Sequence, residues 1–229
     1  NSKQATLNEE QKINASGFSA LNAEVRYLNP VLHVTFPRDT NGVKWANRFT
    51  SVNKKREGVL TTTKIHPDSP VDPKKKANEE YTSEIDWTKV LFAAGPLLIP
   101  SVTVSKANLS REQIIAEKTR LRSLFASLAN AETPAVAAEE GEMYSITFTQ
   151  ESAVYEGAYC WADDRIYGVI YSPEDHFALV QQLRDRGENG VTTIVVPSFV
   201  KPENIHVYSL AMTADGKITS NSVHTTLGA

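Results

Sequence analysis

A single residue offers thiol chemistry. Cys160, the only cysteine, lies beside Trp161 in a tyrosine-rich stretch. A cysteine nucleophile needs a nearby base and an electropositive setting, whereas Asp163 and Asp164 follow this one. Free cysteines are among the most buried residues, so we predict a buried and unreactive thiol. One cysteine also excludes an internal disulfide and any Cys-rich zinc or iron–sulfur site.

Five histidines could bind a metal or transfer protons, but none follows the His-x-x-x-His spacing of a metal site. His206 and His224 could still meet across a final hairpin. Asp215-Gly216 favours a two-residue type I′ turn. That turn would set His206 opposite Thr225, which puts the two histidines on opposite faces of the sheet. We therefore predict no histidine pair, no metal site and no cofactor.

Two acidic groups could supply Ca²⁺ ligands or an acid–base pair, namely Asp163-Asp164 and Glu174-Asp175-His176. The expected strand at 165–171 separates them by roughly 20 Å at about 3.3 Å per residue. Both groups also suit turns at strand ends. No Gly-rich phosphate loop and no Gly-x-Ser-x-Gly elbow occurs in the sequence. The residues therefore predict no catalytic site and a protein that is not an enzyme.

Aromatic residues cluster around the same expected strand and could form a recognition surface. Tyrosine and tryptophan offer large, rigid contact areas and are enriched in such surfaces. The alternative is that the rings fill the core of a β-sandwich. The sequence leaves both interpretations open for this set: Tyr155, Tyr159, Trp161, Tyr167 and Tyr171.

Composition excludes several classes of protein. The 229 residues include 24 Lys and Arg against 27 Asp and Glu, for a formal charge of −3, and 41% are hydrophobic. A near-neutral balance argues against a dedicated nucleic-acid binder. The longest apolar run, residues 90–99, is about half the roughly 20 residues of a membrane-spanning helix, and it contains Gly95 and Pro96. We predict a globular protein with no nucleic-acid partner and no transmembrane segment.

The first part of the chain, residues 1–94, is expected to be mostly helical. Thr6 and Glu9 fit a capping box, and the apolar residues that follow recur at helical spacing until Pro30, a predicted helix end. Residues 31–36 suit either a short strand or more helix. A second helix is expected over 43–57 and ends at Gly58. Residues 61–80 contain three prolines and three consecutive lysines, which predicts a polar connector.

From Glu84 onward the apolar period changes to two, which predicts strands and begins with residues 85–90. The second part of the chain is expected to run from residue 95 to 229. Ser110 and Gln113 cap one expected helix over about 110–131, with Ile114, Leu121, Leu124, Phe125 and Leu128 on one side. Strands are expected at 97–104, 144–149, 165–171, 191–196, 205–212 and 218–227, while 177–183 is ambiguous. Short antiparallel strands at this spacing predict a sandwich and, with the helices, an α+β fold.

The second part resembles a fibronectin type III sandwich. The last two strands have its pattern, an aromatic residue followed by alternating apolar residues and a glycine turn, here Tyr208 to Gly216. The resemblance implies that Tyr208 fills the core and that its hydroxyl bonds to backbone upstream. It also implies that residues 97–104 form strand A, 144–149 B, 165–171 C, 177–183 C′ and 191–196 E. The helix at 110–131 is then an insertion between A and B.

Nearly the whole chain is also similar to a family of uncharacterised Bacteroidetes proteins that is classed as a domain of unknown function. The matching segments are residues 18–36, Glu84-Ile85-Asp86-Trp87-Thr88-Lys89-Val90, Gly95-Pro96-Leu97, Tyr171-Ser172-Pro173-Glu174 and the finish at 205–228. Family members usually begin with a Gly-rich stretch that this chain lacks. The family has no assigned activity, so the resemblance implies a fold and no catalytic residues.

Together these observations predict a structural protein that assembles with copies of itself or with another structural protein, as in a surface filament, a sheath or a virion. Free sandwich edges offer backbone groups for such contacts. The alternative is an extracellular binding module that recognises a carbohydrate or a protein through loops near 155–165 and 172–176. Both interpretations favour an extracellular, cell-surface or virion location over the cytoplasm.

Overall fold

The computed structural model describes residues 7–36, 44–128 and 143–227. Its helices are α1 (Glu9–Thr35), α2 (Trp45–Lys55), α3 (Ala77–Glu80), α4 (Arg111–Leu128) and the 3₁₀ turn η1 (Pro202–Asn204). Its strands are β1 (Leu60–Lys64), β2 (Tyr81–Ile85), β3 (Ser101–Asn108), β4 (Tyr144–Glu151), β5 (Arg165–Ser172), β6 (Phe177–Asp185), β7 (Gly190–Val196), β8 (His206–Met212) and β9 (Val223–Thr225). The chain is α+β with antiparallel sheets, as the sequence predicts.

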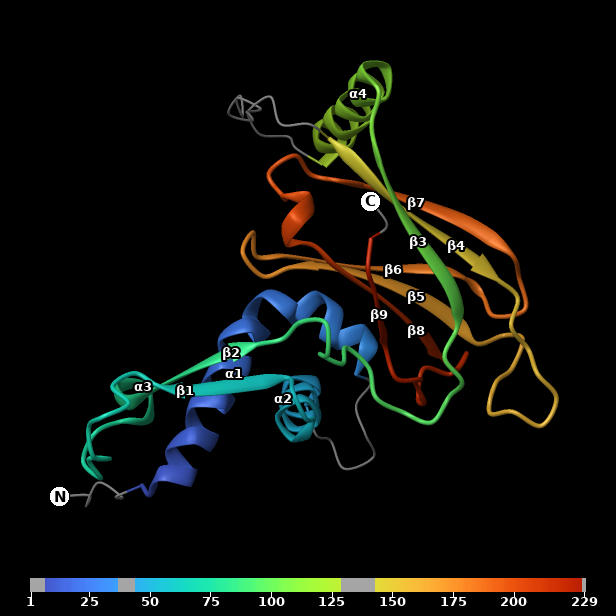
Figure 1. Ribbon diagram of the computed structural model, residues 1–229. Coiled ribbons are helices and arrows are strands. Elements are labelled where there is room, and N and C mark those ends of the chain that lie inside the picture. The colour runs from blue at the N-terminus through green and yellow to red at the C-terminus, as the bar shows by residue number, and fades with distance from the viewer. Residues whose placement is uncertain (1–6, 37–43, 129–142, 228–229) are drawn as a thin grey trace.

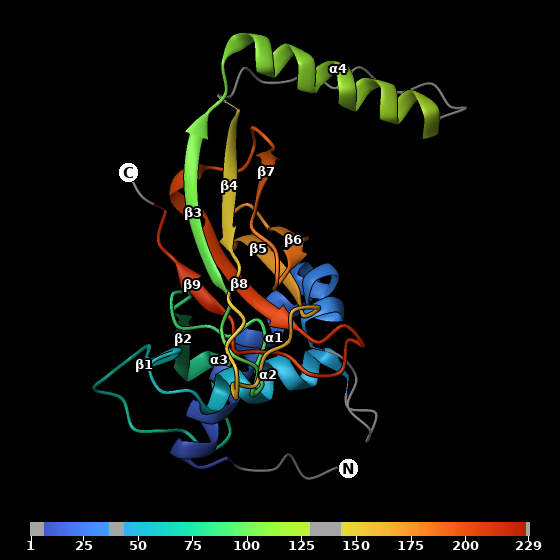
Figure 2. The same cartoon turned by 90° about the vertical axis from the view of Figure 1, so that its right-hand side faces the viewer.

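The elements form three layers (Figure 1). The middle layer is a four-stranded sheet in the order β6-β5-β8-β9, and a three-stranded sheet in the order β3-β4-β7 covers one of its faces. Helices α1 and α2 cover the other face. Helix α4 follows β3 and stands away from the sandwich (Figure 2). None of the described helices is both long enough and apolar enough to span a membrane.

Helix α1 is longer than the sequence predicts. Its capping box is formed by Asn8 and Gln11, and the expected cap Thr6 lies outside the described residues. Pro30 lies inside the helix, which continues through the ambiguous segment to Thr35. Proline removes one backbone hydrogen bond from a helix. Here the next turn places Val31 in the core with its side chain fully buried, and this burial offsets the loss.

The segment expected to be a polar connector is partly ordered structure. Strand β1 pairs with β2 in an antiparallel hairpin, with Leu60 opposite Ile85, and α3 precedes β2. The side chain of Lys12 on α1 is fully buried and pairs with Glu80 of α3. A hydrogen bond from the backbone of Asp72, together with the Lys12 ammonium, lowers the pKa of Glu80. This buried ion pair ties the hairpin to α1, which amphipathic patterning alone does not reveal.

One hydrophobic core crosses the expected boundary between residues 94 and 95. It combines buried residues of α1, α2 and the segment 87–93 with residues of β5 and β8. Tyr208 is fully buried there, and its hydroxyl donates a hydrogen bond to the carbonyl oxygen of Trp87 at 2.5 Å. Burial raises the pKa of this tyrosine well above its ordinary value. The two predicted parts therefore share one core.

A second core lies between the two sheets. Ile146 and Phe148 of β4 face Ile166 and Ile170 of β5 in it. Strands β5 and β8 are therefore buried on both faces, which explains their continuous apolar character. The ambiguous segment 177–183 is part of strand β6, which pairs with β5.

Close packing between the sheets makes a glycine necessary in β5. A Cβ atom at Gly168 would lie 2.6 Å from Cε1 of Phe148. We expect Gly168→Ala to cost about 1–3 kcal/mol of unfolding free energy, because the ring must move. Urea denaturation measures this cost. In a Phe148→Leu background the cost should fall, since the smaller side chain leaves room; an equal cost in both backgrounds would contradict the described packing.

Candidate functional site

The structure divides the five aromatic residues into two groups. Tyr155, Tyr159 and Trp161 are 59%, 48% and 45% exposed, whereas Tyr167 and Tyr171 are buried. The last two point to the helical side of β5 and join the core there. The hydroxyl of Tyr171 donates a hydrogen bond to Glu24 of α1 at 2.5 Å. Including these two in a recognition surface is therefore wrong, because α1 covers the face on which they lie.

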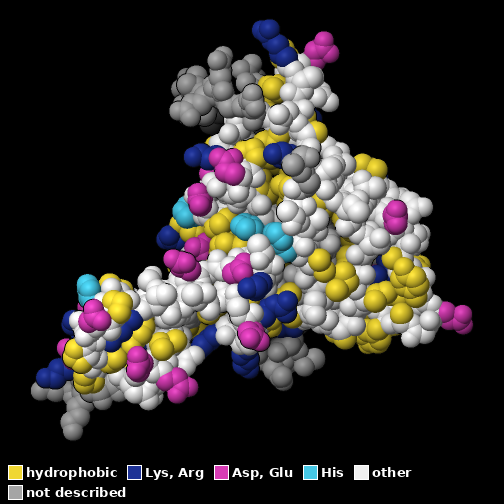
Figure 3. Space-filling model, in the orientation of Figure 1, with side chains coloured by type: hydrophobic (Ala, Val, Ile, Leu, Met, Phe, Trp, Pro, Cys, Tyr) yellow, Lys and Arg dark blue, Asp and Glu magenta, His cyan; other side chains and the backbone are white. Residues whose placement is uncertain are grey.

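The three exposed rings lie on the loop between β4 and β5, at one end of the sandwich. The rings of Tyr159 and Trp161 meet edge to face, with centroids 4.9 Å apart. The carbonyl oxygen of Tyr159 accepts a hydrogen bond from the backbone N–H of Leu98, which is also partly exposed. We call Tyr155, Tyr159, Trp161 and Leu98 the aromatic end. Figure 3 shows hydrophobic side chains gathered over this loop.

A buried ion pair holds the aromatic end in place. The guanidinium of Arg186 donates to Asp164 Oδ2 at 2.9 Å and to the carbonyl oxygen of Leu98 at 2.6 Å, and both charged side chains are 1% exposed. Asp164 Oδ2 also accepts the backbone N–H of Trp161. A buried pair that bonds to two separate backbone segments fixes their relative position. The loop is thus presented on a rigid support.

Cys160 belongs to this loop and its side chain is buried, as the sequence predicts. Its sulfur lies 3.4 Å from the backbone nitrogen of Tyr155, which donates to it. This contact closes the loop on itself. The geometry gives the side chain a positioning role within the loop.

The second expected recognition loop lies at the opposite end of β5. Asp175 there accepts hydrogen bonds from the hydroxyl of Ser172 and the backbone N–H of Lys201. Burial raises the pKa of Asp175, but these bonds outweigh it and leave the pKa lowered. His176 stacks on Tyr27 with ring centroids 3.8 Å apart. The length of β5 separates the loops at 155–165 and 172–176, as the strand expected between them predicts.

The two histidines of the last strands form a pair that sequence reasoning rejected. Nδ1 of His206 lies 3.3 Å from Nε2 of His224, and β8 and β9 pair with Tyr208 opposite His224. Nearer the turn, Met212 pairs with Thr219, so the register shifts by one residue between this pair and β9. The shift brings both imidazoles to one face of the sheet.

The turn itself differs from the expected type I′ turn. Gly216 has a φ of 72°, whereas Asp215 does not have a positive φ. The loop instead spans the residues between Thr213 and Ile218, whose backbones are hydrogen bonded. The Asp215 carboxylate accepts hydrogen bonds from the Thr213 hydroxyl and the backbone of Lys217, which lower its pKa to about 2. Asp215 and Gly216 therefore keep a structural role in a longer loop.

The histidine pair is half-buried and electrostatically coupled. Burial, and after it the neighbouring His224, lower the pKa of His206 to about 4, while Asp86 opposes the shift. Burial also lowers the pKa of His224. Two neutral imidazoles can share one hydrogen bond, whereas two imidazolium ions at this distance repel each other. Among the described residues, no group of three or more His, Cys, Asp or Glu side chains is arranged to hold a metal ion.

Comparison of the chain with protein-family models, with curated proteins and with solved structures finds no match.

The free energy of unfolding should depend on pH through the histidine pair. The pKa of His206 is about 4 in the folded protein and about 6.5 in the unfolded chain. Between these two pH values the folded protein therefore binds fewer protons than the unfolded chain. Stability is therefore lost as the pH falls from about 6.5 to 4. Urea denaturation at pH 7.5, 5.5 and 4.5 measures the loss. The variant His206→Asn with His224→Gln should lose less; an unchanged pH profile would contradict this coupling.

Proposed function

We propose that this protein is a non-enzymatic structural protein that assembles with copies of itself or with another structural protein, through the free edge of β3. The observation that carries the proposal is the edge strand itself, which spans eight residues and is largely exposed. The other sheet edges offer less: β9 spans three residues, β6 contacts α1, and β7 contacts β6. Strands β1 and β2 of the hairpin span five residues each and both contact α1. Long exposed edges are the usual sites of strand addition.

The backbone of β3 supports the proposal in detail. The N–H of Leu109 donates to the carbonyl oxygen of Met143, the residue before β4, one position beyond the last pair of the register, Asn108 with Tyr144. Backbone groups of an antiparallel pair face the partner strand at every second residue. Val104 and Lys106 therefore direct their N–H and C=O groups away from β4. A further strand could pair with these groups.

Helix α4 supplies a second contact element in this proposal. Ser110 and Gln113 cap it as the sequence predicts, and it follows β3 directly. Ile115 on it is 57% exposed, and the helix stands away from the sheets (Figure 2). A helix beside an open edge would extend the interface beyond the strand.

We further propose that the sandwich is of the fibronectin type III kind, with α4 as an inserted helix. The strands expected as A, B and E correspond to β3, β4 and β7, which form one sheet. The strands expected as C and C′ correspond to β5 and β6, which share the other sheet with the last two strands. Modules of this architecture occur in many cell-surface proteins, which favours an extracellular, cell-surface or virion location.

Two substitutions at one exposed position test the assembly proposal. Lys106→Pro removes a free-edge N–H, and edge strands tolerate proline where that group faces solvent. Lys106→Thr keeps the N–H and removes a charge that discourages strand pairing. We expect Lys106→Thr to assemble at lower concentration than the natural chain and Lys106→Pro to remain monomeric, with melting temperatures within a few degrees. Light scattering and electron microscopy report the outcome.

Two results would count against assembly through β3. If Lys106→Pro assembles as readily as the natural chain, another surface is responsible. If the natural chain and Lys106→Thr both stay monomeric at high concentration, self-assembly fails altogether. Ser105→Pro is the matched control for folding, because its N–H faces β4 and its loss should lower stability.

The second candidate is a binding module, and the aromatic end favours it. Exposed Tyr and Trp side chains on a rigid support are typical of recognition sites. On an array of purified glycans, Trp161→Ala with Tyr159→Ala should lose binding with a melting temperature within a few degrees of the natural chain. Phe199→Ala is the control, since Phe199 is 63% exposed and lies outside the aromatic end. Binding that persists without both rings would rule out this module.

A further inference from the structure

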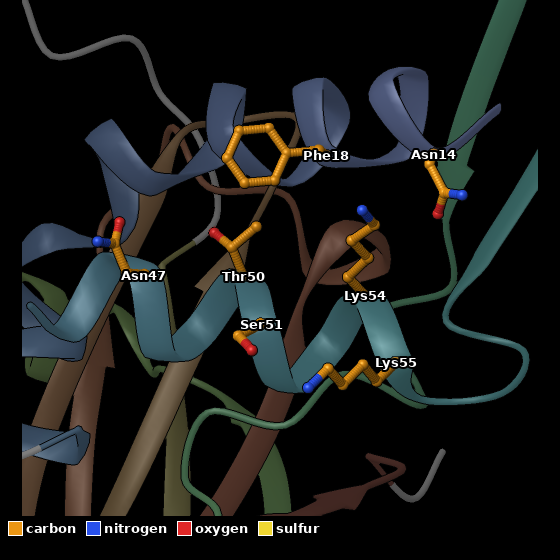
Figure 4. A pocket seen from close by; sticks show the side chains of 7 residues that line it. All are labelled: Asn14, Phe18, Asn47, Thr50, Ser51, Lys54 and Lys55. Atoms are coloured by element: carbon orange, nitrogen blue, oxygen red, sulfur yellow. The ribbon is translucent and has the colours of Figure 1, made fainter. Parts of the chain in front are cut away.

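A groove between α1 and α2 belongs to neither surface described above (Figure 4). Its volume is about 660 Å³, within the range of small-molecule sites, and seven residues line it: Asn14, Phe18, Asn47, Thr50, Ser51, Lys54 and Lys55. Figure 4 shows Phe18 on α1 facing Thr50 and Lys54 on α2. A smaller cavity of about 240 Å³ shares Asn14 and Lys54 and extends towards β1. The helices and the hairpin thus form a continuous depression.

The charged groups of this groove are all cationic. Lys54 and Lys55 are its ionisable lining residues, and neither forms an ion pair or a side-chain hydrogen bond with the described residues. By contrast, Lys12, Lys89 and Lys217 are each paired with a carboxylate. The segment 44–56 carries five basic residues and no acidic one, in a chain whose net charge is −3. Positive charge is therefore concentrated at α2.

The neutral lining residues add hydrogen-bond donors and one apolar wall. The side chains of Asn14, Asn47 and Ser51 make no hydrogen bond within the described part of the chain, so two amides and a hydroxyl remain available. Phe18 is 46% exposed and presents its ring to the groove. Ammonium, amide and hydroxyl donors together suit an anionic oxygen group, and a partly exposed ring suits an apolar or aromatic group beside it.

Helix electrostatics account for part of this arrangement. Lysines in the last turn of a helix interact favourably with its dipole, which explains their presence at the end of α2. That interaction does not require Phe18 and the unbonded Asn14 amide of α1 to line the same groove. The groove combines the lysines of α2 with donor and aromatic side chains of α1, and this combination indicates a ligand.

We propose that this groove binds a small anionic ligand whose phosphate or carboxylate contacts Lys54 and Lys55 and whose apolar part packs on Phe18. The site is independent of the assembly edge and of the aromatic end, and binding therefore survives in the Lys106→Pro variant. Ionic contacts at an exposed groove weaken with added salt, so affinity falls as ionic strength rises.

Three probes separate the two halves of the proposed ligand: phenyl phosphate, inorganic phosphate and phenol. Titration by NMR of the isotope-labelled protein should show saturable shifts of α1 and α2 backbone amides. Phenyl phosphate should bind at least tenfold more tightly than either other probe. Lys54→Gln with Lys55→Gln should weaken phenyl phosphate at least tenfold, and Phe18→Ala should reduce its affinity to that of inorganic phosphate.

A matched control distinguishes a site from general attraction to basic residues. Lys74→Gln with Lys75→Gln removes two exposed charges elsewhere and should leave the affinity unchanged. The proposal is overturned if this control weakens binding as much as the groove variant does, or if phenyl phosphate produces no saturable shifts in α1 and α2. Since each substituted side chain is exposed, thermal unfolding should confirm that every variant remains folded.

Discussion

The four-stranded sheet is apolar on both faces, and the rest of the structure depends on burying both at once. Strands β5 and β8 have almost no exposed residue, so each face needs its own cover. The three-stranded sheet covers one face, and α1, α2 and the segment 87–93 cover the other. At about 25 cal/mol per Å² of apolar surface, removing either cover would expose more than the net stability of a domain can sustain.

Buried polar groups set how the covering layers sit on that sheet. The hydroxyls of Tyr208 and Tyr171 bond to Trp87 and to Glu24 in the helical layer. Because an unpaired buried donor is costly, these bonds select one arrangement among many with similar apolar contact. The Arg186 pair does the same at the end of the sandwich, where it joins two backbone segments. Hydrophobic burial stabilises the folded chain, and these polar contacts select a single arrangement of its layers.

Burial on both faces also limits where the protein can meet other molecules. Among the described residues, the exposed parts are the sheet edge at β3, the outer face of the three-stranded sheet, the loops at the strand ends and the outer sides of the helices. The aromatic end is available because it precedes β5, whereas Tyr171, ten residues after Trp161, is covered by α1. Position relative to β5 thus decides whether an aromatic residue is exposed or packed in the core, although the residue types are alike.

The sequence by itself determined many of the secondary-structure elements, because their patterns are local. The alternation in β4, the apolar runs of β5 and β8 and the Ser110 cap follow from interactions within a few residues, and the sequence predicts all of them. Tertiary structure decided the rest. Pro30 stays helical because the next turn is buried, and the two histidines meet because a one-residue register shift lies in the final hairpin. Both outcomes depend on energies of contact between distant segments, which no short stretch of sequence contains.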